Sequence, residues 1–187
     1  LGSYDGACNL AFLSNCRIGA IVTLGSNMNL PKIGEIKKLV IPINDSPYEN
    51  IASIFHRTFD FIDSSRKAGL NVLVHCYAGV SRSSTIVIAY LMRKHNMDFQ
   101  SAFMFVLNKR QIINPNFGFI TQLRDFEKSL STSHHNLRHT YHEGNRRHSM
   151  DLNIPKQTNG DGNIENQGFG NRGVNRISLS RNRKLFN

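Results

Sequence analysis

The 187-residue sequence is poor in acidic residues, with 13 Asp and Glu against 23 Lys and Arg, so its formal net charge is +10. Residues 1–130 hold 14 basic and 9 acidic side chains, and residues 131–187 hold 9 and 4. The shorter segment therefore carries half of the excess. A positive field attracts anionic partners in general, including phosphopeptides, nucleic acids and acidic lipid headgroups. Charge alone does not choose among them.

The sequence is also poor in cysteine and in long apolar runs. Its three cysteines, Cys8, Cys16 and Cys76, are too few and odd in number for a secreted fold held together by disulfides, and they favour a reducing compartment. No run approaches the roughly 20 apolar residues needed to cross a bilayer. The N-terminus lacks the pattern of a secretory signal peptide. These absences predict a cytoplasmic chain without a membrane span, with the nucleus as a second location.

Apolar strands alternate with amphipathic helices over the first 130 residues. Short apolar runs predict strands at residues 18–24, 39–43 and 72–74. Apolar residues at helical spacing predict helices over residues 51–68, 83–94, 98–110 and 117–130. This alternation is typical of an α/β fold with a central, mostly parallel or mixed sheet and helices on both faces.

The last third of the chain has a different composition. Residues 131–187 contain 10 Asn, 6 Gly and 5 His without a sustained apolar period, which predicts a disordered tail after one domain over residues 1–130. Four tail histidines could face a metal from one side of a helix, but they lack a Cys or carboxylate partner, so chance enrichment is the better explanation. They are His134, His135, His139 and His142. The basic run at residues 181–184 is better explained as solvated tail than as a nuclear signal or a nucleic-acid patch.

One loop of small residues joins a predicted buried strand to a predicted buried helix. It reads His75-Cys76-Tyr77-Ala78-Gly79-Val80-Ser81-Arg82-Ser83. A loop at a helix N-terminus turns its backbone N–H groups toward one point and binds anions, so residues 77–81 are predicted to cradle a phosphate. Arg82 would add a planar, bidentate guanidinium. The same field would lower the pKa of the Cys76 thiol below its free value of about 8.5 and make it a nucleophile.

Two neighbours of this cysteine have predicted supporting roles. The Ser83 hydroxyl can donate to the sulfur and help a thiolate to leave, and His75 is better placed to orient the loop than to attack. The alternative is an ordinary buried cysteine at the end of a strand. The flanking His, Gly and Ser residues, with a strand before and a helix after, favour the catalytic interpretation.

The loop from His75 to Ser83 resembles the signature of dual-specificity phosphatases, in the cysteine-based protein tyrosine phosphatase superfamily. The resemblance covers nearly all of residues 1–130 and stops at the tail. It includes further motifs in the same order, which are Leu1-Gly2-Ser3, Ile41-Pro42 to Asp45, Ala89-Tyr90-Leu91-Met92, and Ile113-Asn114-Pro115-Asn116 through Gln122-Leu123. The resemblance implies a protein tyrosine phosphatase-like fold and a two-step reaction through a phosphocysteine. No metal or other cofactor is expected, because the loop itself neutralises the phosphate.

The resemblance also assigns residues outside the loop. Asp45 matches the general acid of the family, on a loop able to close over the site; without the cysteine loop, a turn-forming Asp before a proline would be the better interpretation. Asp60 and Asp63 are weaker candidates because they lie on a predicted helix. Asn114 and Asn116 match a segment that supports the phosphate loop, although a role as plain turn residues explains each of them nearly as well.

The function implied is hydrolysis of phosphotyrosine and of phosphoserine or phosphothreonine on proteins, with phosphorylated proteins such as mitogen-activated protein kinases as partners. Two alternatives remain open: the same chemistry on a phosphoinositide, glycan or RNA 5′-phosphate, and a non-catalytic phospho-binding scaffold. Lipid-acting relatives tend to carry Lys inside the loop, and residues 77–81 contain no Lys. Pseudophosphatases usually lose the Cys or the Arg, and both are present here. The expected protein is a small, monomeric phosphatase that does not bind nucleic acid. Because family members begin with further strands before Leu1, and the chain lacks an initiator Met, a fragment or a processed chain is expected.

Overall fold

A parallel three-stranded sheet organises the fold. The computed structural model describes residues 1–32 and 34–146, with side chains described as far as residue 132. The strands are β1 (Ile18–Leu24), β2 (Lys37–Ile41) and β3 (Asn71–His75), in the order β2-β1-β3. All of the described strand pairs are parallel. The predicted α/β architecture with a mostly parallel sheet is confirmed.

The middle strand explains why the sheet is buried on both faces. Five successive residues of β1, from Ala20 to Leu24, are buried, as the apolar run in the sequence requires. Leu24 is in register with Ile41, and Thr23 is in register with His75. The carboxyl ends of the three strands therefore meet at one edge of the sheet, where α/β proteins bind their ligands.

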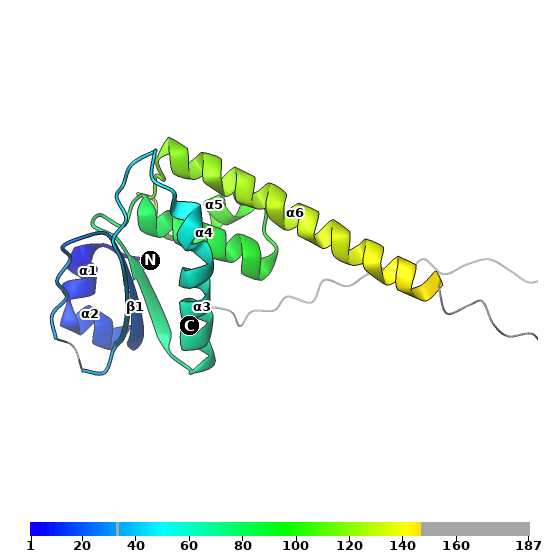
Figure 1. The fold of residues 1–187 in the computed structure, drawn as a ribbon. Helices are drawn as coiled ribbons and strands as arrows, with labels where there is room; N and C mark the ends of the chain where they lie inside the picture. Colours follow the sequence, from blue (N-terminus) through cyan, green and yellow to red (C-terminus); the bar gives the residue numbers. More distant parts are fainter. Residues whose placement is uncertain (33, 147–187) are drawn as a thin grey trace, which may run out of the picture. The chain divides into compact units, whose positions relative to one another are not determined.

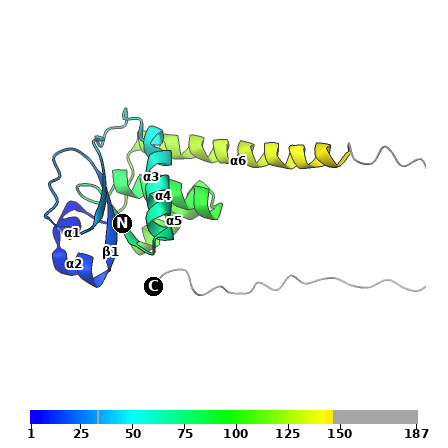
Figure 2. The same ribbon diagram turned by 60° about the horizontal axis from the view of Figure 1, so that its bottom comes forward.

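Helices cover both faces of the sheet (Figures 1 and 2). Two short helices, α1 (Tyr4–Cys8) and α2 (Leu10–Asn15), lie on one face. The other face carries the longer helices, which are α3 (Phe55–Lys67) preceded by the 3-10 turn η1 (Ile51–Ile54), α4 (Arg82–His95), α5 (Phe99–Lys109) and α6 (Phe117–Arg146). Helix α4 is central to this layer, and nine of its fourteen residues are buried. The prediction of a buried helix after the loop agrees with this burial.

The structure corrects the sequence-based interpretation at both ends of the domain. Helices α1 and α2 were not predicted, although each begins at a side-chain cap: Ser3 accepts from the N–H of Gly6, and Asn9 accepts from the N–H of Phe12. Helix α6 continues past Leu130 to Arg146, so it is longer than the helix predicted over residues 117–130. No Pro, and no Gly before Gly144, interrupts that segment. The rest of the predicted tail, residues 147–187, lies outside the described residues.

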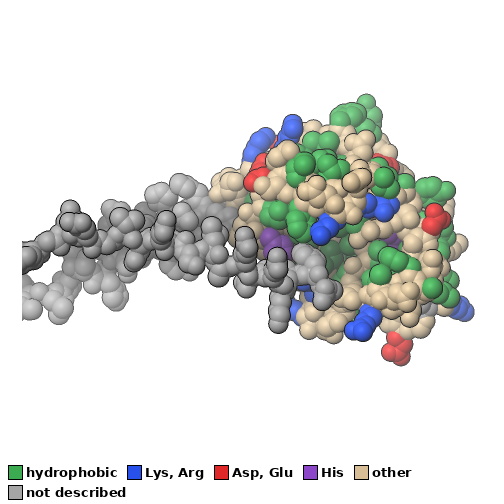
Figure 3. All heavy atoms as spheres, turned by 180° about the vertical axis from the view of Figure 1, so that it is seen from behind, with side chains coloured by type: hydrophobic (Ala, Val, Ile, Leu, Met, Phe, Trp, Pro, Cys, Tyr) green, Lys and Arg blue, Asp and Glu red, His purple; other side chains and the backbone are tan. Residues whose placement is uncertain are grey.

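Basic side chains are dispersed on the face seen from behind. Figure 3 shows Lys and Arg at several separate places on that face, with apolar side chains between them. On this face, the positive charge is not gathered into the single stripe that tracks a nucleic-acid backbone. Among the described residues, none of the helices combines the length and the apolar character that a bilayer crossing requires.

Candidate active site

The phosphate loop predicted from the sequence lies at the carboxyl edge of the sheet. Strand β3 ends at His75 and α4 begins at Arg82, so residues 76–81 connect the central sheet directly to the most buried helix. Gly79 has a positive φ of 68°. A Cβ atom there would lie 2.5 Å from the carbonyl oxygen of Gly2, so the tight turn of the loop requires glycine at this position.

Cys76 lies at the base of this loop and is almost completely buried, with 1% of its surface exposed. Burial alone raises the pKa of a thiol, because it removes water from the charged form. Hydrogen bonds from the Ser83 hydroxyl and from the backbone N–H groups of Ser83, Gly79 and Val80 outweigh burial and hold the pKa of Cys76 below its ordinary value. These hydrogen bonds favour the thiolate form over the thiol.

Ser83 is the side chain that approaches this sulfur most directly. Its Oγ lies 3.2 Å from Cys76 Sγ, within the range for a hydrogen bond to sulfur, and Ser83 is fully buried. The position in the first turn of α4 also places the sulfur near the positive end of the helix dipole. The hydroxyl can therefore donate to a thiolate each time one forms.

The Arg82 side chain reaches the residues that follow β1 and β2. Its Nη1 donates to the carbonyl oxygen of Ile43 at 3.2 Å, which fixes the plane of the guanidinium. Its Nε is buried and has no hydrogen-bond partner within the described part of the chain. A Cβ atom on Gly25, at the end of β1, would lie 2.7 Å from Arg82 Nη1, so Gly25 leaves the space that the guanidinium occupies. The remaining donors are available to phosphate oxygens.

Asp45 follows the end of β2 and is held beside the phosphate loop. Its Oδ1 accepts hydrogen bonds from the Ser81 hydroxyl at 2.7 Å and from Asn116 Nδ2 at 2.9 Å. Its Oδ2 lies 3.6 Å from Arg82 Nε. The carboxyl side chain is 36% exposed, so it faces both the loop and solvent. This position suits a group that exchanges a proton with a phosphate ester bound in the loop.

His75 orients the loop from below. Its Nδ1 lies 3.2 Å from the carbonyl oxygen of Cys76, which can only accept, so Nδ1 carries the proton. Nε2, 2.8 Å from Thr23 Oγ1, then accepts from the threonine hydroxyl. Burial lowers the pKa of His75, which keeps the ring neutral and consistent with this arrangement. The predicted orienting role agrees with this geometry, in which the ring is fully buried.

Comparison with known proteins identifies this arrangement. Residues 1–129 match the family described as "Dual specificity phosphatase, catalytic domain". The chain belongs to this family. A similar protein from Arabidopsis thaliana, "Dual specificity protein phosphatase 1", is 40% identical over 133 residues, which are 71% of this chain and 67% of that protein.

Other members of the dual specificity phosphatase family are similar over the same region. The human "Dual specificity protein phosphatase 1" is 40% identical over 134 residues, which are 72% of this chain but 36% of the relative. The solved structure of human DUSP28 is 28% identical and superposes with a TM-score of 0.68 over 71% of this chain and 93% of that one. The fold of this chain is thus that of a dual specificity phosphatase.

The phosphatase domain contains supporting residues that sequence reasoning missed. Arg110 donates from Nε to the carbonyl oxygen of Gly79 at 3.0 Å and from Nη2 to that of Ala78 at 3.2 Å. These bonds satisfy two carbonyls of the phosphate loop. Arg110 closely precedes the matched asparagine segment, but nothing in its spacing indicated a contact with a loop about thirty residues earlier in the chain.

Asn114 and Asn116 both make hydrogen bonds to the phosphate loop. The backbone N–H of Asn114 donates to the carbonyl oxygen of Val80 at 3.0 Å. Three of the hydrogen bonds of Asn116 link the surrounding segments: its N–H donates to Ser81 Oγ at 3.1 Å, its side chain donates to Asp45, and its Oδ1 accepts from the N–H of Phe119 as the cap of α6. Asn116 therefore joins the phosphate loop, the Asp45 loop and α6, whereas Asn114 acts through its backbone.

The competing aspartates lie elsewhere. Asp63 accepts from the hydroxyl of Tyr90 at 2.7 Å and from Lys94 at 3.2 Å, which ties α3 to α4. The bond from Tyr90 lowers the pKa of Asp63, and burial together with Asp63 raises the pKa of Tyr90 to about 12. Asp63 is a structural residue. Asp60 lies exposed on the same helix.

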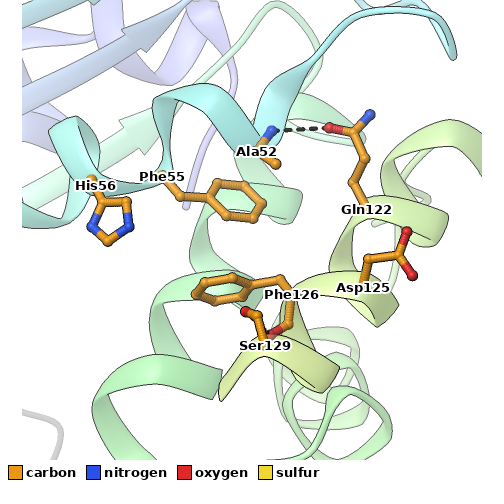
Figure 4. Close-up of a pocket in the computed structure, with 7 residues that line it drawn as sticks. All are labelled: Ala52, Phe55, His56, Gln122, Asp125, Phe126 and Ser129. Carbon is orange, nitrogen blue, oxygen red and sulfur yellow. Dashed lines mark hydrogen bonds between the residues drawn. The ribbon is translucent and has the colours of Figure 1, made fainter. Parts of the chain in front are cut away.

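A pocket lies between α6 and the segment formed by η1 and the start of α3 (Figure 4). It has a volume of about 410 Å³ and is lined by Ala52, Phe55, His56, Gln122, Asp125, Phe126 and Ser129. Gln122 accepts from the N–H of Ala52 at 2.9 Å and donates to the carbonyl oxygen of Glu49 at 2.8 Å. The Gln122 amide therefore joins the segment after Asp45 to α6. The loop that carries Asp45 is thus also anchored at its C-terminal end.

The remaining candidates receive no structural support. Side chains of the four tail histidines, and the basic run at residues 181–184, lie outside the described residues. Within residues 1–32 and 34–132, no three His, Cys, Asp or Glu side chains come together in a way that could hold a metal ion. Cys8 is partly buried and Cys16 is exposed, and both are free thiols.

Proposed function

We propose that this dual specificity phosphatase hydrolyses phosphotyrosine and phosphoserine or phosphothreonine in proteins through a phosphocysteine intermediate. The observation that carries the proposal is the Cys76 thiol with its lowered pKa, beneath the amides of the phosphate loop and followed by Arg82, whose Nε has no hydrogen-bond partner among the described residues. Nucleophile, anion site and clamp are contributed by one short segment.

In the first step, the amides of residues 77–81 and the Arg82 guanidinium bind the phosphate oxygens. The Cys76 thiolate attacks phosphorus, a bond forms between sulfur and phosphorus, and the bond to the ester oxygen breaks. Asp45, as a carboxylic acid, gives its proton to that leaving oxygen. The dephosphorylated side chain departs as a neutral alcohol or phenol.

In the second step, Asp45 acts in the reverse direction. Its carboxylate takes a proton from a water molecule, whose oxygen attacks phosphorus as the bond to sulfur breaks. The Ser83 hydroxyl, 3.2 Å from the sulfur, stabilises the departing thiolate. Inorganic phosphate leaves and the thiolate is ready for another substrate.

Residues 1–130 are proposed as the catalytic unit, in line with the family match over residues 1–129. Phosphorylated signalling proteins, among them mitogen-activated protein kinases, are the proposed substrates of a monomeric enzyme in the cytoplasm and the nucleus. The absence of Lys from residues 77–81 argues against a phosphoinositide as substrate. The presence of both Cys76 and Arg82 argues against a non-catalytic scaffold.

Phosphate release from a substrate panel tests this proposal. The panel contains peptides with phosphotyrosine, phosphothreonine or phosphoserine, together with a phosphoinositide, a phosphorylated glycan and an RNA 5′-phosphate. The phosphotyrosine peptide and at least one of the other two peptides should have the highest kcat/KM. Preference for the phosphoinositide, the glycan or the RNA would assign the same chemistry to a non-protein substrate. Binding without hydrolysis would favour the scaffold.

A further inference from the structure

Large exposed apolar side chains lie on the segments that build the phosphate site. Tyr77, inside the phosphate loop, is 69% exposed; Ile112 and Phe117, between α5 and the start of α6, are 57% and 68% exposed. Tyr48, three residues after Asp45, is 94% exposed. Single exposed apolar residues are ordinary on protein surfaces. Four of them around one polar site call for a binding partner.

Hydrogen bonds place the segment of Ile112 against the phosphate loop. Arg110 donates to the carbonyl oxygens of Gly79 and Ala78, and the N–H of Asn114 donates to that of Val80. Ile112 lies midway between these two anchors in the chain. Its exposed side chain is therefore carried at the border of the loop.

The segments of Phe117 and Tyr48 meet on the side of Asp45. Asn116, next to Phe117, donates to the Asp45 carboxylate at 2.9 Å. A Cβ atom on Gly118 would collide with the backbone of Pro47, so the first turn of α6 rests on the Asp45 loop. In the sequence, Phe117 is next to Gly118, and Tyr48 is next to Pro47.

Tyr77 is held in place on the phosphate loop itself. Its ring stacks on that of Tyr4, with centroids 6.4 Å apart and planes inclined by 13°. The Tyr4 hydroxyl donates to the carbonyl oxygen of Asn29 at 2.9 Å, which anchors the Tyr4 ring. An aromatic ring fixed in this way can contact a ligand with little loss of side-chain entropy.

We propose that Tyr48, Tyr77, Ile112 and Phe117 form an apolar rim that recognises a bulky apolar side chain next to the phosphorylated residue of a protein substrate. This inference rests on the proposed function. An extended peptide advances about 3.3–3.6 Å per residue, so side chains one or two positions from the phosphorylated residue reach the border of the loop. The occupant is the substrate chain because the rim is continuous with the phosphate site.

Matched phosphopeptides test the rim. Two phosphotyrosine peptides are identical except that Leu and Phe flank the phosphorylated residue in one and Ser flanks it in the other. Wild-type enzyme should show a kcat/KM about tenfold higher for the apolar peptide, which is the scale of discrimination that apolar contacts supply. The double variant I112S/F117S should bring the ratio close to unity while hydrolysis of an aryl phosphate, which has no flanking residues, is retained.

Leu10→Ser is the matched control. Leu10 is 54% exposed on α2, which lies on the face of the sheet opposite to α4, α5 and α6. This variant should keep the wild-type preference. Tyr48→Ser, in the most exposed rim residue, provides a second variant and should also reduce the ratio.

Other outcomes would overturn the inference. Equal kcat/KM of the wild-type enzyme for both peptides would contradict substrate recognition by the apolar rim and leave the proposed function intact. Hydrolysis of neither peptide would contradict the proposed function itself. A parallel loss of aryl phosphate turnover in I112S/F117S would assign these residues to the architecture of the site. A wild-type dimer that becomes monomeric in the double variant would assign the rim to self-association.

Discussion

Replacing Cys76 by serine is expected to lower the turnover of an aryl phosphate by about 10⁴-fold or more, the scale on which loss of a covalent nucleophile acts. Serine fills the same buried position, but its hydroxyl ionises far less readily than a thiol whose pKa is held below its ordinary value. The amides of residues 77–81 and the Arg82 guanidinium remain in place. Phosphopeptide binding, measured by fluorescence polarisation, should therefore persist while phosphate release stops.

Cys16→Ser is the matched control for this substitution. Cys16 is an exposed free thiol that follows α2, and its carbonyl oxygen accepts from Asn71 at the start of β3, the end opposite to the phosphate loop. Its replacement should therefore leave turnover at the wild-type level. A Cys76→Ser variant that turns over as fast as Cys16→Ser would exclude Cys76 as the nucleophile. Loss of binding together with loss of turnover would instead indicate that the loop had rearranged.

Replacing Asp45 by asparagine is expected to reduce kcat by about 10²- to 10³-fold on phosphothreonine peptides, because an amide cannot supply the proton that an alkoxide leaving group needs. The loss should be smaller on aryl phosphates whose phenol leaves easily as an anion. Asparagine retains an oxygen that can accept from Ser81 and Asn116, so the loop geometry is preserved. Turnover measured against a series of substituted phenyl phosphates reveals this dependence.

Asp125→Asn provides the control for the same chemical change. Asp125 is an exposed aspartate that pairs with Lys128 at 2.7 Å on α6. Its replacement should leave kcat unchanged for every substrate in the series. An equal loss for all leaving groups in Asp45→Asn would contradict the acid role and would point to a contribution of Asp45 to binding through Arg82.

The position of the phosphate loop between a strand and a helix was predictable because the loop is one continuous segment. A buried strand, small residues and a buried helix in sequence place Cys76, Arg82 and Ser83 relative to one another with little help from the rest of the chain. Asp45 was predictable only through the resemblance, since an Asp before a proline-containing turn has no distinctive pattern of its own. Its hydrogen bond to Asn116 joins residues separated by 71 positions.

Other features could not be derived in this way. The contacts of Arg110 with the phosphate loop and of Gln122 with the segment after Asp45 depend on how helices pack, and a single sequence does not encode those distances in its spacing. The end of α6 was misjudged for another reason. The apolar period ends at Leu130, so the predicted helix ended there, whereas the backbone continues as a helix to Arg146 in the absence of an early Pro or Gly.

Selective carboxymethylation of Cys76 tests the central claim, which is that the loop holds a thiolate. The protein is treated with iodoacetate at mildly acidic pH, with and without vanadate, and the modified peptides are counted by mass spectrometry. Because the pKa of Cys76 lies below its ordinary value, Cys76 should react faster than the exposed Cys16, and vanadate should protect it. Faster reaction of Cys16, or reaction of Cys76 that vanadate does not slow, would contradict the account.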